Sequence, residues 1–194
     1  GPLDELVQGK TPAPELAEAM ARNASRLERL IGQLLDLERI EARRFPLRPE
    51  ILDLARLVRE AATAFTPLAK NEGITLDSRV PAASVPVCGD LEQLFRVVGN
   101  LLSNAVKYGQ ASAPVVVEVY PQDDAACCSV TDSGGRLAED EVPEIFKRHF
   151  RGEHAATTLG SGVGLNIAQQ LAQLQQGRIQ VEVDPGHFTR FILA

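Results

Sequence analysis

The chain has 194 residues, of which 44% are hydrophobic, and this is enough to bury one sizeable core and a smaller appendage. Its formal net charge of -6 and its lack of a Lys/Arg cluster argue against nucleic-acid binding and against contact with a membrane surface. Its three cysteines, two of them adjacent, do not suit a disulfide framework, so we expect a reducing, cytoplasmic setting. No run approaches the eighteen or more apolar residues of a membrane span, so we expect a soluble fragment.

A long amphipathic helix is predicted from Pro14 onward. Its apolar residues recur at spacings of three and four, at Leu16, Met20, Leu27, Leu30, Ile31, Leu34 and Leu37. The preceding "GPLDELVQGKTPAP" resembles the tail of an earlier helix and a proline-rich turn, and together they predict a helical hairpin. One hairpin buries little apolar surface. We therefore expect the row of apolar residues to pack against a second copy in a four-helix bundle, or alternatively against the rest of the same chain.

The two prolines in "FPLRPEILDL" end this pattern, which predicts a helical segment over 1–44 and a second domain over 45–194. The β-rich runs "APVVVEVY" and "AACCSVTD" are separated by a turn signal, which predicts a β-hairpin. Two final strands are predicted in "RIQVEV" and "HFTRFIL". A strand is also predicted in "GITLDSRV", and helices are predicted over 53–71, from "GDLEQ" onward, over 141–150 and over 163–176. The fold class is therefore α+β, a two-layer sandwich with helices on one face of a mostly antiparallel sheet.

The helix that begins at "GDLEQ" carries an unusual polar row. Asp90 is expected to cap its first turn, with Gln93 completing a capping box. Asn100, Asn104 and Lys107 then lie at i, i+4 and i+7, although asparagine is unfavourable inside a helix. An amide oxygen suits Mg²⁺ and a lysine suits phosphate, but hydrogen-bonded or solvated asparagines remain the alternative.

Two glycine-containing stretches are further candidates for a nucleotide site. Gly160, Gly162 and Gly164 open a helix, whose free N–H groups favour an anion, although most such loops are only flexible. The pattern fits neither a dinucleotide fingerprint nor a Walker motif. Asp132 ends a β-rich run and precedes Gly134. Its carboxylate could accept a hydrogen bond from the exocyclic amine of adenine, or alternatively the residue belongs to an ordinary turn.

The order of these motifs resembles the catalytic and ATP-binding domain of sensor histidine kinases from two-component systems. "NLLSNAVKYG" is similar to their N box, "DSGG" to the first glycine box, "EIFKRHFRG" to the F box and "GSGVGLNIA" to the second glycine box. "ASRLERLIGQLLDLERIEA" resembles the second helix of their dimerisation and phosphotransfer hairpin. The resemblance implies a sandwich of the Bergerat (GHKL) type that binds ATP and Mg²⁺, preceded by part of a dimeric helical bundle.

The resemblance also implies roles for particular residues. Asn104 would ligate Mg²⁺, and Asn100 would assist around the metal and phosphates. Lys107 and Tyr108 would contact phosphate and nucleotide, while Asp132 would bind the adenine amine with Gly134 beside the base. The phosphates would be lined by Gly160, Gly162, Gly164 and Leu165, with Arg151 reaching the γ-phosphate.

The same resemblance implies a sensor kinase core that dimerises through its N-terminal helices and signals to a response regulator or receiver domain, in a parent protein anchored in the bacterial inner membrane. Gyrase and heat-shock chaperones of the same superfamily carry a glutamate at the position of Asn100, and an amide cannot activate water as that base does. Phosphoryl transfer is therefore favoured over hydrolysis. A serine kinase of the anti-sigma type is disfavoured by the long helix.

Four departures from the family pattern support a second hypothesis about the function. The phosphoacceptor motif H-E-[LI]-[RK]-[TN]-P does not occur, so we expect the fragment to begin after it. Arg136 replaces the last glycine of Asp-x-Gly-x-Gly, His149 stands where phenylalanine is usual, and "QQG" at 175–177 replaces a common His-Gly-Gly. The alternative function is a degenerate kinase-like protein that binds ATP weakly or not at all and regulates another sensor kinase by protein–protein interaction.

Overall fold

The computed structural model describes residues 14–42, 44–111, 113–122, 125–134, 137–148, 150 and 162–194. The chain divides between Phe45 and Pro46 into two compact units, called unit 1 and unit 2 below in chain order. The segment before Pro14, where the tail of an earlier helix is predicted, lies outside the described residues. Neither α2 of unit 1 nor any other described helix combines the length and the hydropathy that a membrane span requires.

Helix α2 (Pro14–Glu41) confirms the predicted long amphipathic helix of unit 1. Four of its apolar side chains are about half exposed, namely Leu27 at 59%, Ile31 at 51%, Leu34 at 53% and Leu35 at 47%. Large apolar side chains grouped on one helix usually mark an interaction surface in a soluble protein. Packing of this surface in a four-helix bundle stays a prediction.

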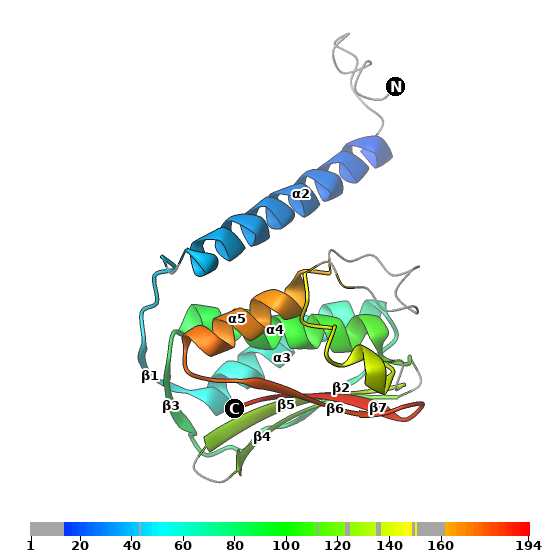
Figure 1. The fold of residues 1–194 in the computed structure, drawn as a ribbon. Coiled ribbons are helices and arrows are strands. Elements are labelled where there is room, and N and C mark those ends of the chain that lie inside the picture. Colours follow the sequence, from blue (N-terminus) through cyan, green and yellow to red (C-terminus); the bar gives the residue numbers. More distant parts are fainter. Residues whose placement is uncertain are drawn as a thin grey trace. The chain divides into compact units, whose positions relative to one another are not determined.

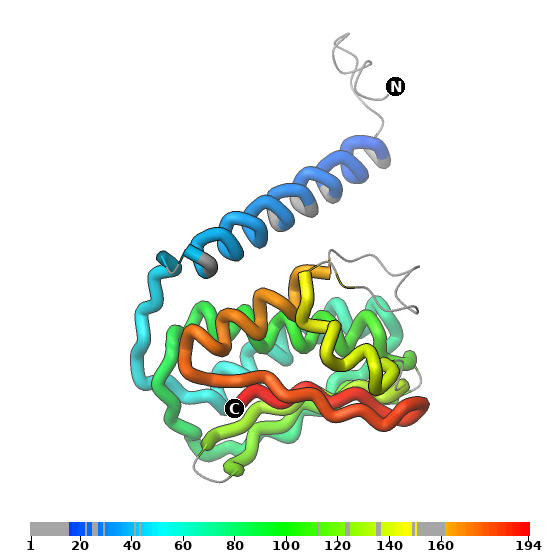
Figure 2. Tube along the Cα trace, in the orientation of Figure 1, coloured from blue at the N-terminus to red at the C-terminus, as the bar shows by residue number. Residues whose placement is uncertain are grey.

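Unit 2 is a two-layer sandwich in which three helices cover one face of a five-stranded sheet (Figures 1 and 2). The helices are α3 (Leu54–Asn71), α4 (Leu91–Tyr108) and α5 (Gly164–Leu174). The strands of this sheet are β2 (Leu76–Arg79), β4 (Val115–Gln122), β5 (Ala125–Ser133), β6 (Ile179–Asp184) and β7 (Phe188–Leu193). Their order is β2-β4-β5-β7-β6, with only β2 and β4 parallel, so the predicted α+β class is confirmed.

Alternation along β4 explains where the core lies. Val115, Val117 and Val119 are buried, while the residues between them are partly exposed. Val117 and Val119 pair with Val130 and Cys128 of β5, so their buried side chains share the face that the helices cover. Each buried valine contributes about 1.5–3 kcal/mol. The complete burial of Cys128 raises its pKa to about 12.

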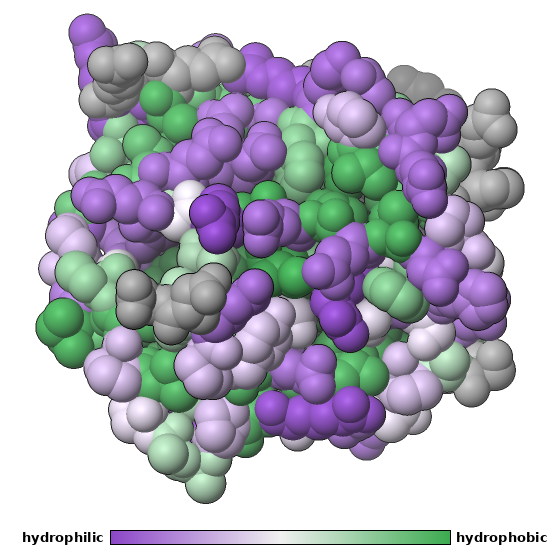
Figure 3. Space-filling view, turned by 60° about the horizontal axis from the view of Figure 1, so that its bottom comes forward, coloured by the Kyte–Doolittle hydropathy of each residue, from purple (hydrophilic) through white to green (hydrophobic). Residues whose placement is uncertain are grey.

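The opposite face of the sheet carries ion pairs, both within a strand and between neighbouring strands. Arg79 contacts Asp77 at 2.8 Å and Glu118 at 3.6 Å, and Arg190 contacts Glu182 at 3.3 Å. Figure 3, in which the lower side of Figure 1 comes forward, shows such hydrophilic side chains interspersed with hydrophobic ones. Exposed pairs of this kind are worth at most about 1 kcal/mol each, so they shape the surface more than they stabilise the fold.

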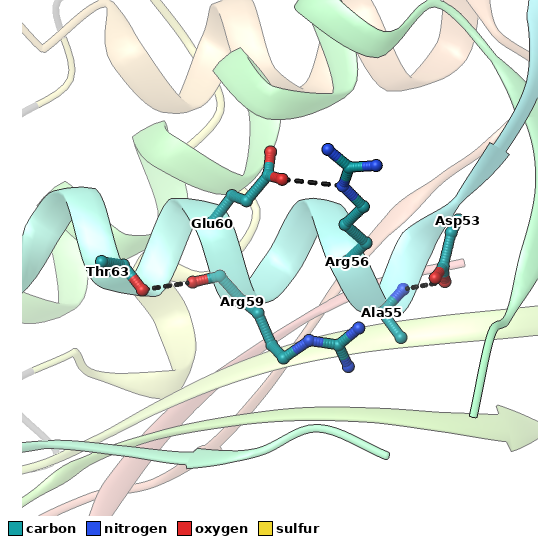
Figure 4. A network of polar contacts seen from close by, with 6 residues as sticks. All are labelled: Asp53, Ala55, Arg56, Arg59, Glu60 and Thr63. Carbon is teal, nitrogen blue, oxygen red and sulfur yellow. Dashed lines mark hydrogen bonds and ion pairs between the residues drawn. The ribbon is translucent and has the colours of Figure 1, made fainter. Parts of the chain in front are cut away.

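Helix α3 begins at a well-satisfied cap (Figure 4). The Asp53 carboxylate accepts hydrogen bonds from the backbone N–H of Ala55 at 3.0 Å and of Val85 at 2.9 Å. The bond from Val85 is the main cause that lowers the pKa of Asp53 below its ordinary value. One turn on, Arg56 and Glu60 form an exposed i,i+4 pair at 2.8 Å.

Two parts of unit 2 differ from the prediction. Strands β1 (Glu50–Asp53) and β3 (Pro86–Gly89) form a separate antiparallel pair that the sequence analysis did not identify. The helix predicted over 141–150 is wrong for the residues described there, because the chain forms a 3-10 helix η1 (Glu139–Glu141) followed by turns. Most backbone N–H groups in this stretch donate to the carbonyl three residues earlier, and Pro143 has no N–H to donate to a helix.

Candidate functional site

Helix α4 places the predicted polar row along the edge of the core. The Asp90 side chain caps the helix by accepting from the Gln93 N–H at 3.1 Å, as predicted. Asn100, Asn104 and Lys107 lie on one side of α4 and are partly exposed, whereas the leucines and valines between them are buried. Lys107 is in the last turn, where the helix dipole favours a cation.

The start of α5 lies directly against this polar row. A Cβ atom added to Gly164, the first residue of α5, would be 3.1 Å from Oδ1 of Asn100. That distance is shorter than ordinary van der Waals contact, so the absence of a side chain at 164 is what lets the two helices meet here. The structure therefore brings Asn100 of the N box together with Gly164 of the second glycine box.

The other end of α4 meets the end of β5. Asp132 is only 3% exposed, and a Cβ atom at Gly109, which follows α4, would be 3.6 Å from the Cβ of Asp132. The N–H of Gln110 donates to the carbonyl of Ser133 at 2.9 Å and fixes this contact. Asp132 thus lies beside the turn that carries Lys107 and Tyr108, both partly exposed.

Two of the candidate glycines have backbone conformations that other residues rarely adopt. Gly134 has φ +141°, and its N–H donates to the carbonyl of His187 at 2.9 Å. Gly162 has φ 67° and leads through Val163 into α5, whose first turn has no side-chain cap. Uncapped N–H groups at a helix start are suited to binding an anion, and Leu165 in that turn is partly exposed.

Four residues singled out in the sequence lie outside the described residues: Arg151, Gly160, Arg136 and His149. The roles implied for Arg151 and Gly160, and the effects of Arg136 and His149, therefore stay predictions. In the described parts of the chain, no group of three or more His, Cys, Asp or Glu side chains is placed to hold a metal ion. The amide oxygens of Asn100 and Asn104 have the hard, neutral character that Mg²⁺ accepts.

The sequence analysis missed two side-chain amides that connect these elements. Asn166, in the first turn of α5, donates from Nδ2 to the Phe146 carbonyl at 2.7 Å and accepts from Gln170 at 3.0 Å. Gln175, at the end of α5, accepts from the Asp90 N–H at 2.6 Å. The predicted capping box is thus half wrong, because Gln175 rather than Gln93 binds the Asp90 N–H. An asparagine inside a helix was the available signal for Asn166, whereas Gln175 was noted only as part of the departure at 175–177, with no indication of its partner.

Known proteins resemble this chain along most of its length. Residues 89–194 match the family model described as "Histidine kinase-, DNA gyrase B-, and HSP90-like ATPase". Sensor protein EvgS of Escherichia coli O157:H7 is 32% identical over 170 residues, which are 84% of this chain and 14% of EvgS. Sensor histidine kinase TmoS of Ectopseudomonas mendocina is 30% identical over 193 residues, 96% of this chain and 20% of TmoS. This chain thus spans a fifth or less of the length of either protein.

A solved structure agrees in fold. The Acinetobacter baumannii histidine kinase AdeS superposes with a TM-score of 0.78 at 21% identity, covering 100% of this chain and 90% of the AdeS chain. The family model covers more than half of the 194 residues, including α4, β5 and α5. The chain therefore belongs to the histidine kinase-, DNA gyrase B- and HSP90-like ATPase family, as a catalytic ATP-binding domain of the sensor histidine kinase kind.

Proposed function

We propose that unit 2 binds ATP with Mg²⁺ and acts as the kinase core of a two-component sensor histidine kinase. The observation that carries this proposal is the meeting of three motifs along α4. Asn100 lies against Gly164 at the start of α5, and Asp132 lies beside the last turn of α4. A nucleotide extended along α4 would have its base near Asp132 and its phosphates near the start of α5.

At the base end, the Asp132 carboxylate would accept a hydrogen bond from the exocyclic amine of adenine. Its nearly complete burial favours this role because a hydrogen bond to the amine is stronger where water is excluded. Gly134 would lie beside the base, and its backbone conformation is one that side chains disfavour. Lys107 and Tyr108, in the neighbouring turn, would contact phosphate and nucleotide.

At the phosphate end, the uncapped start of α5 would offer N–H groups to the phosphates, lined by Gly160, Gly162, Gly164 and Leu165. Asn104 would ligate Mg²⁺, Asn100 would assist around metal and phosphates, and Arg151 would reach the γ-phosphate. The bound Mg²⁺ would supply charge neutralisation on the phosphates.

The reaction favoured by these residues is transfer rather than hydrolysis. An asparagine at position 100 can orient and hydrogen-bond, but it cannot remove a proton from water as a carboxylate can. Phosphoryl transfer depends mainly on positioning and charge stabilisation, which the residues above would supply. The acceptor would be a histidine absent from this chain, and the phosphoryl group would pass on to a response regulator or receiver domain.

Titration with a fluorescent ATP analogue, with and without Mg²⁺, tests the nucleotide site. We expect saturable binding that Asn104→Ala and Asp132→Ala both remove. Asn71→Ala is the matched control, because Asn71 is an exposed asparagine at the end of another helix. If the wild-type chain shows no saturable binding at millimolar nucleotide, the kinase proposal is wrong for this chain.

We also propose that α2 forms a homodimer through Leu27, Ile31 and Leu34. These side chains lie at i, i+4 and i+7 and are each more than half exposed. Sedimentation should give a dimer for the wild type and a monomer for Ile31→Glu, because a buried unpaired carboxylate in the bundle would be costly. A wild-type monomer at micromolar concentration would contradict this assembly.

Arg136 supports a second candidate function, a degenerate kinase that regulates another sensor kinase. A non-glycine residue in the last position of the first glycine box would cost about 1–2 kcal/mol if that position needs a left-handed backbone. The substitution Arg136→Gly separates the two candidates. If the chain is a degenerate kinase, nucleotide binding is weak or absent in the wild type and strengthens in Arg136→Gly, whereas the kinase function requires strong binding in both.

A further inference from the structure

The Gln175 carboxamide joins the end of α5 to the start of α4. Its Oε1 accepts from the Asp90 N–H at 2.6 Å, and its Nε2 donates to the Leu171 carbonyl at 3.2 Å. Helix ends leave backbone groups without partners in their own helix, and this one side chain satisfies a group at each of two helix ends. Both bonds require an amide, because the contact with Asp90 needs an acceptor and the contact with Leu171 needs a donor.

The backbone before α4 closely surrounds this amide. A Cβ atom at Gly89 would be 3.0 Å from Oε1 of Gln175 and 2.6 Å from Cδ1 of Leu94. Any side chain at position 89 would therefore push either the amide or Leu94 away. The approach of Gln175 to Asp90 is thus supported by a second feature of the sequence, the glycine at 89.

Asp90 also binds the chain that enters unit 2. Its side chain is 6% exposed, and while Oδ1 accepts from the Gln93 N–H, Oδ2 accepts from the Arg48 N–H at 2.8 Å. Arg48 lies two residues after the start of unit 2. Asp90 therefore connects three elements: the entering chain, the first turn of α4 and, through Gln175, the last turn of α5.

Helices α4 and α5 are consequently held together at two places. Gly164 meets Asn100 at the candidate site, and Gln175 meets Asp90 at the other end. The two helices pack along each other in opposite chain directions (Figure 2). About ten residues of helix separate the two places on each helix, which is roughly 15 Å. A shift of α5 at Gln175 would therefore move Gly164 relative to Asn100.

We propose that Gln175 is a positioning residue for the nucleotide site, which holds the entering chain and the two site helices in one arrangement. This inference rests on the proposed function, because the site it positions is the proposed ATP site. Gln175 itself is not expected to touch nucleotide, since its bonds are to Asp90 and Leu171 at the far end of both helices.

Gln175→Met tests the proposal because methionine keeps the length and approximate shape of glutamine without its polar atoms. Gln173→Met is the matched control, since Gln173 is an exposed glutamine one turn or less away on α5. Two quantities are measured at a temperature at which every variant is fully folded. They are the dissociation constant of a fluorescent ATP analogue with Mg²⁺ and the amide hydrogen exchange of Arg48, Asp90 and Gln93.

We expect Gln175→Met to speed exchange at Asp90 and Arg48 and to weaken nucleotide binding roughly fivefold, the equivalent of one ordinary hydrogen bond. Gln173→Met should change neither quantity. Faster exchange with unchanged affinity would overturn the positioning role, because the bond would then matter only for the local fold. Unchanged exchange would overturn the link itself. If the wild type binds no nucleotide, the proposed function fails, and the positioning role fails with it, whereas the exchange data still decide whether the link exists.

Discussion

The substitution Gly164→Ala is expected to affect nucleotide binding while leaving the stability of the fold nearly unchanged. An alanine Cβ would be 3.1 Å from Oδ1 of Asn100, about 0.3 Å inside the 3.4 Å at which ordinary contact begins. The helix itself gains somewhat from the change, because alanine is favoured over glycine by about 1 kcal/mol in a helix interior and by less at the first residue, where Gly164 lies. We therefore expect the thermal unfolding midpoint to stay within a few degrees of the wild type.

Nucleotide affinity should respond differently. If Asn100 turns away and loses one contact with the charged phosphates or metal, binding weakens by about 1.5 kcal/mol, or roughly tenfold in the dissociation constant. Titration with a fluorescent ATP analogue in the presence of Mg²⁺ measures this change. Gly32→Ala is the control, because Gly32 lies in α2 with no other atom within 4 Å of its added Cβ. Wild-type affinity in Gly164→Ala would refute the assignment of this contact to the nucleotide site.

Three further predictions concern stability and reactivity. Gln176 has φ 63°, so Gln176→Gly should relieve strain of about 1 kcal/mol, offset in part by the entropy of glycine in the unfolded chain, and raise the unfolding midpoint by roughly 1–2 °C. A lower midpoint in a thermal melt would contradict this. Cys88 is exposed while the other two cysteines are buried, and burial raises the pKa of Cys128 to about 12. One thiol per chain should therefore react rapidly with a disulfide reagent at pH 8, and Cys88→Ser should remove that reaction. The backbone bond from Val85 lowers the pKa of Asp53, so its carboxylate stabilises the fold fully above about pH 4 and progressively less as the pH falls through the lowered value. The difference in unfolding midpoint between the wild type and Asp53→Ala should shrink in acid, and a difference that grows there would argue against this account.

Strong periodicity made much of the fold predictable. The long apolar stripes of α2 and α4 and the β-rich runs of β4 and β5 each specify an element from neighbouring residues alone. The stretch over 141–150 has apolar residues at helical spacing too, but after η1 its residues 142–148 form turns and a bend. Strands β1 and β3 have four residues each and contain or adjoin prolines, so neither provides a clear alternating pattern.

The candidate site was predictable only as a set of motifs. Asn100 and Asp132 were identified from residue type and order, but their neighbours came from the structure. The partner of the Asp90 N–H shows the difference clearly. Gln93, three residues away, fits a local capping rule, whereas the true partner, Gln175, is 85 residues away in the sequence. A rule built on short spacing cannot detect such a bond.

Strand β7 lies between β5 and β6 in the sheet, although it is the last of these strands in the chain. Asp132 of β5 is paired with Thr189 of β7, so the end of β5 that carries Asp132 lacks one neighbouring strand until β7 has been made. During synthesis, α4 and the β4–β5 hairpin leave the ribosome long before that strand. The protein therefore passes through a state in which the residues proposed to bind adenine have left the ribosome but β7, which supports them, has not. The nucleotide site and the sheet would then be completed together, late in the folding of the newly synthesised chain.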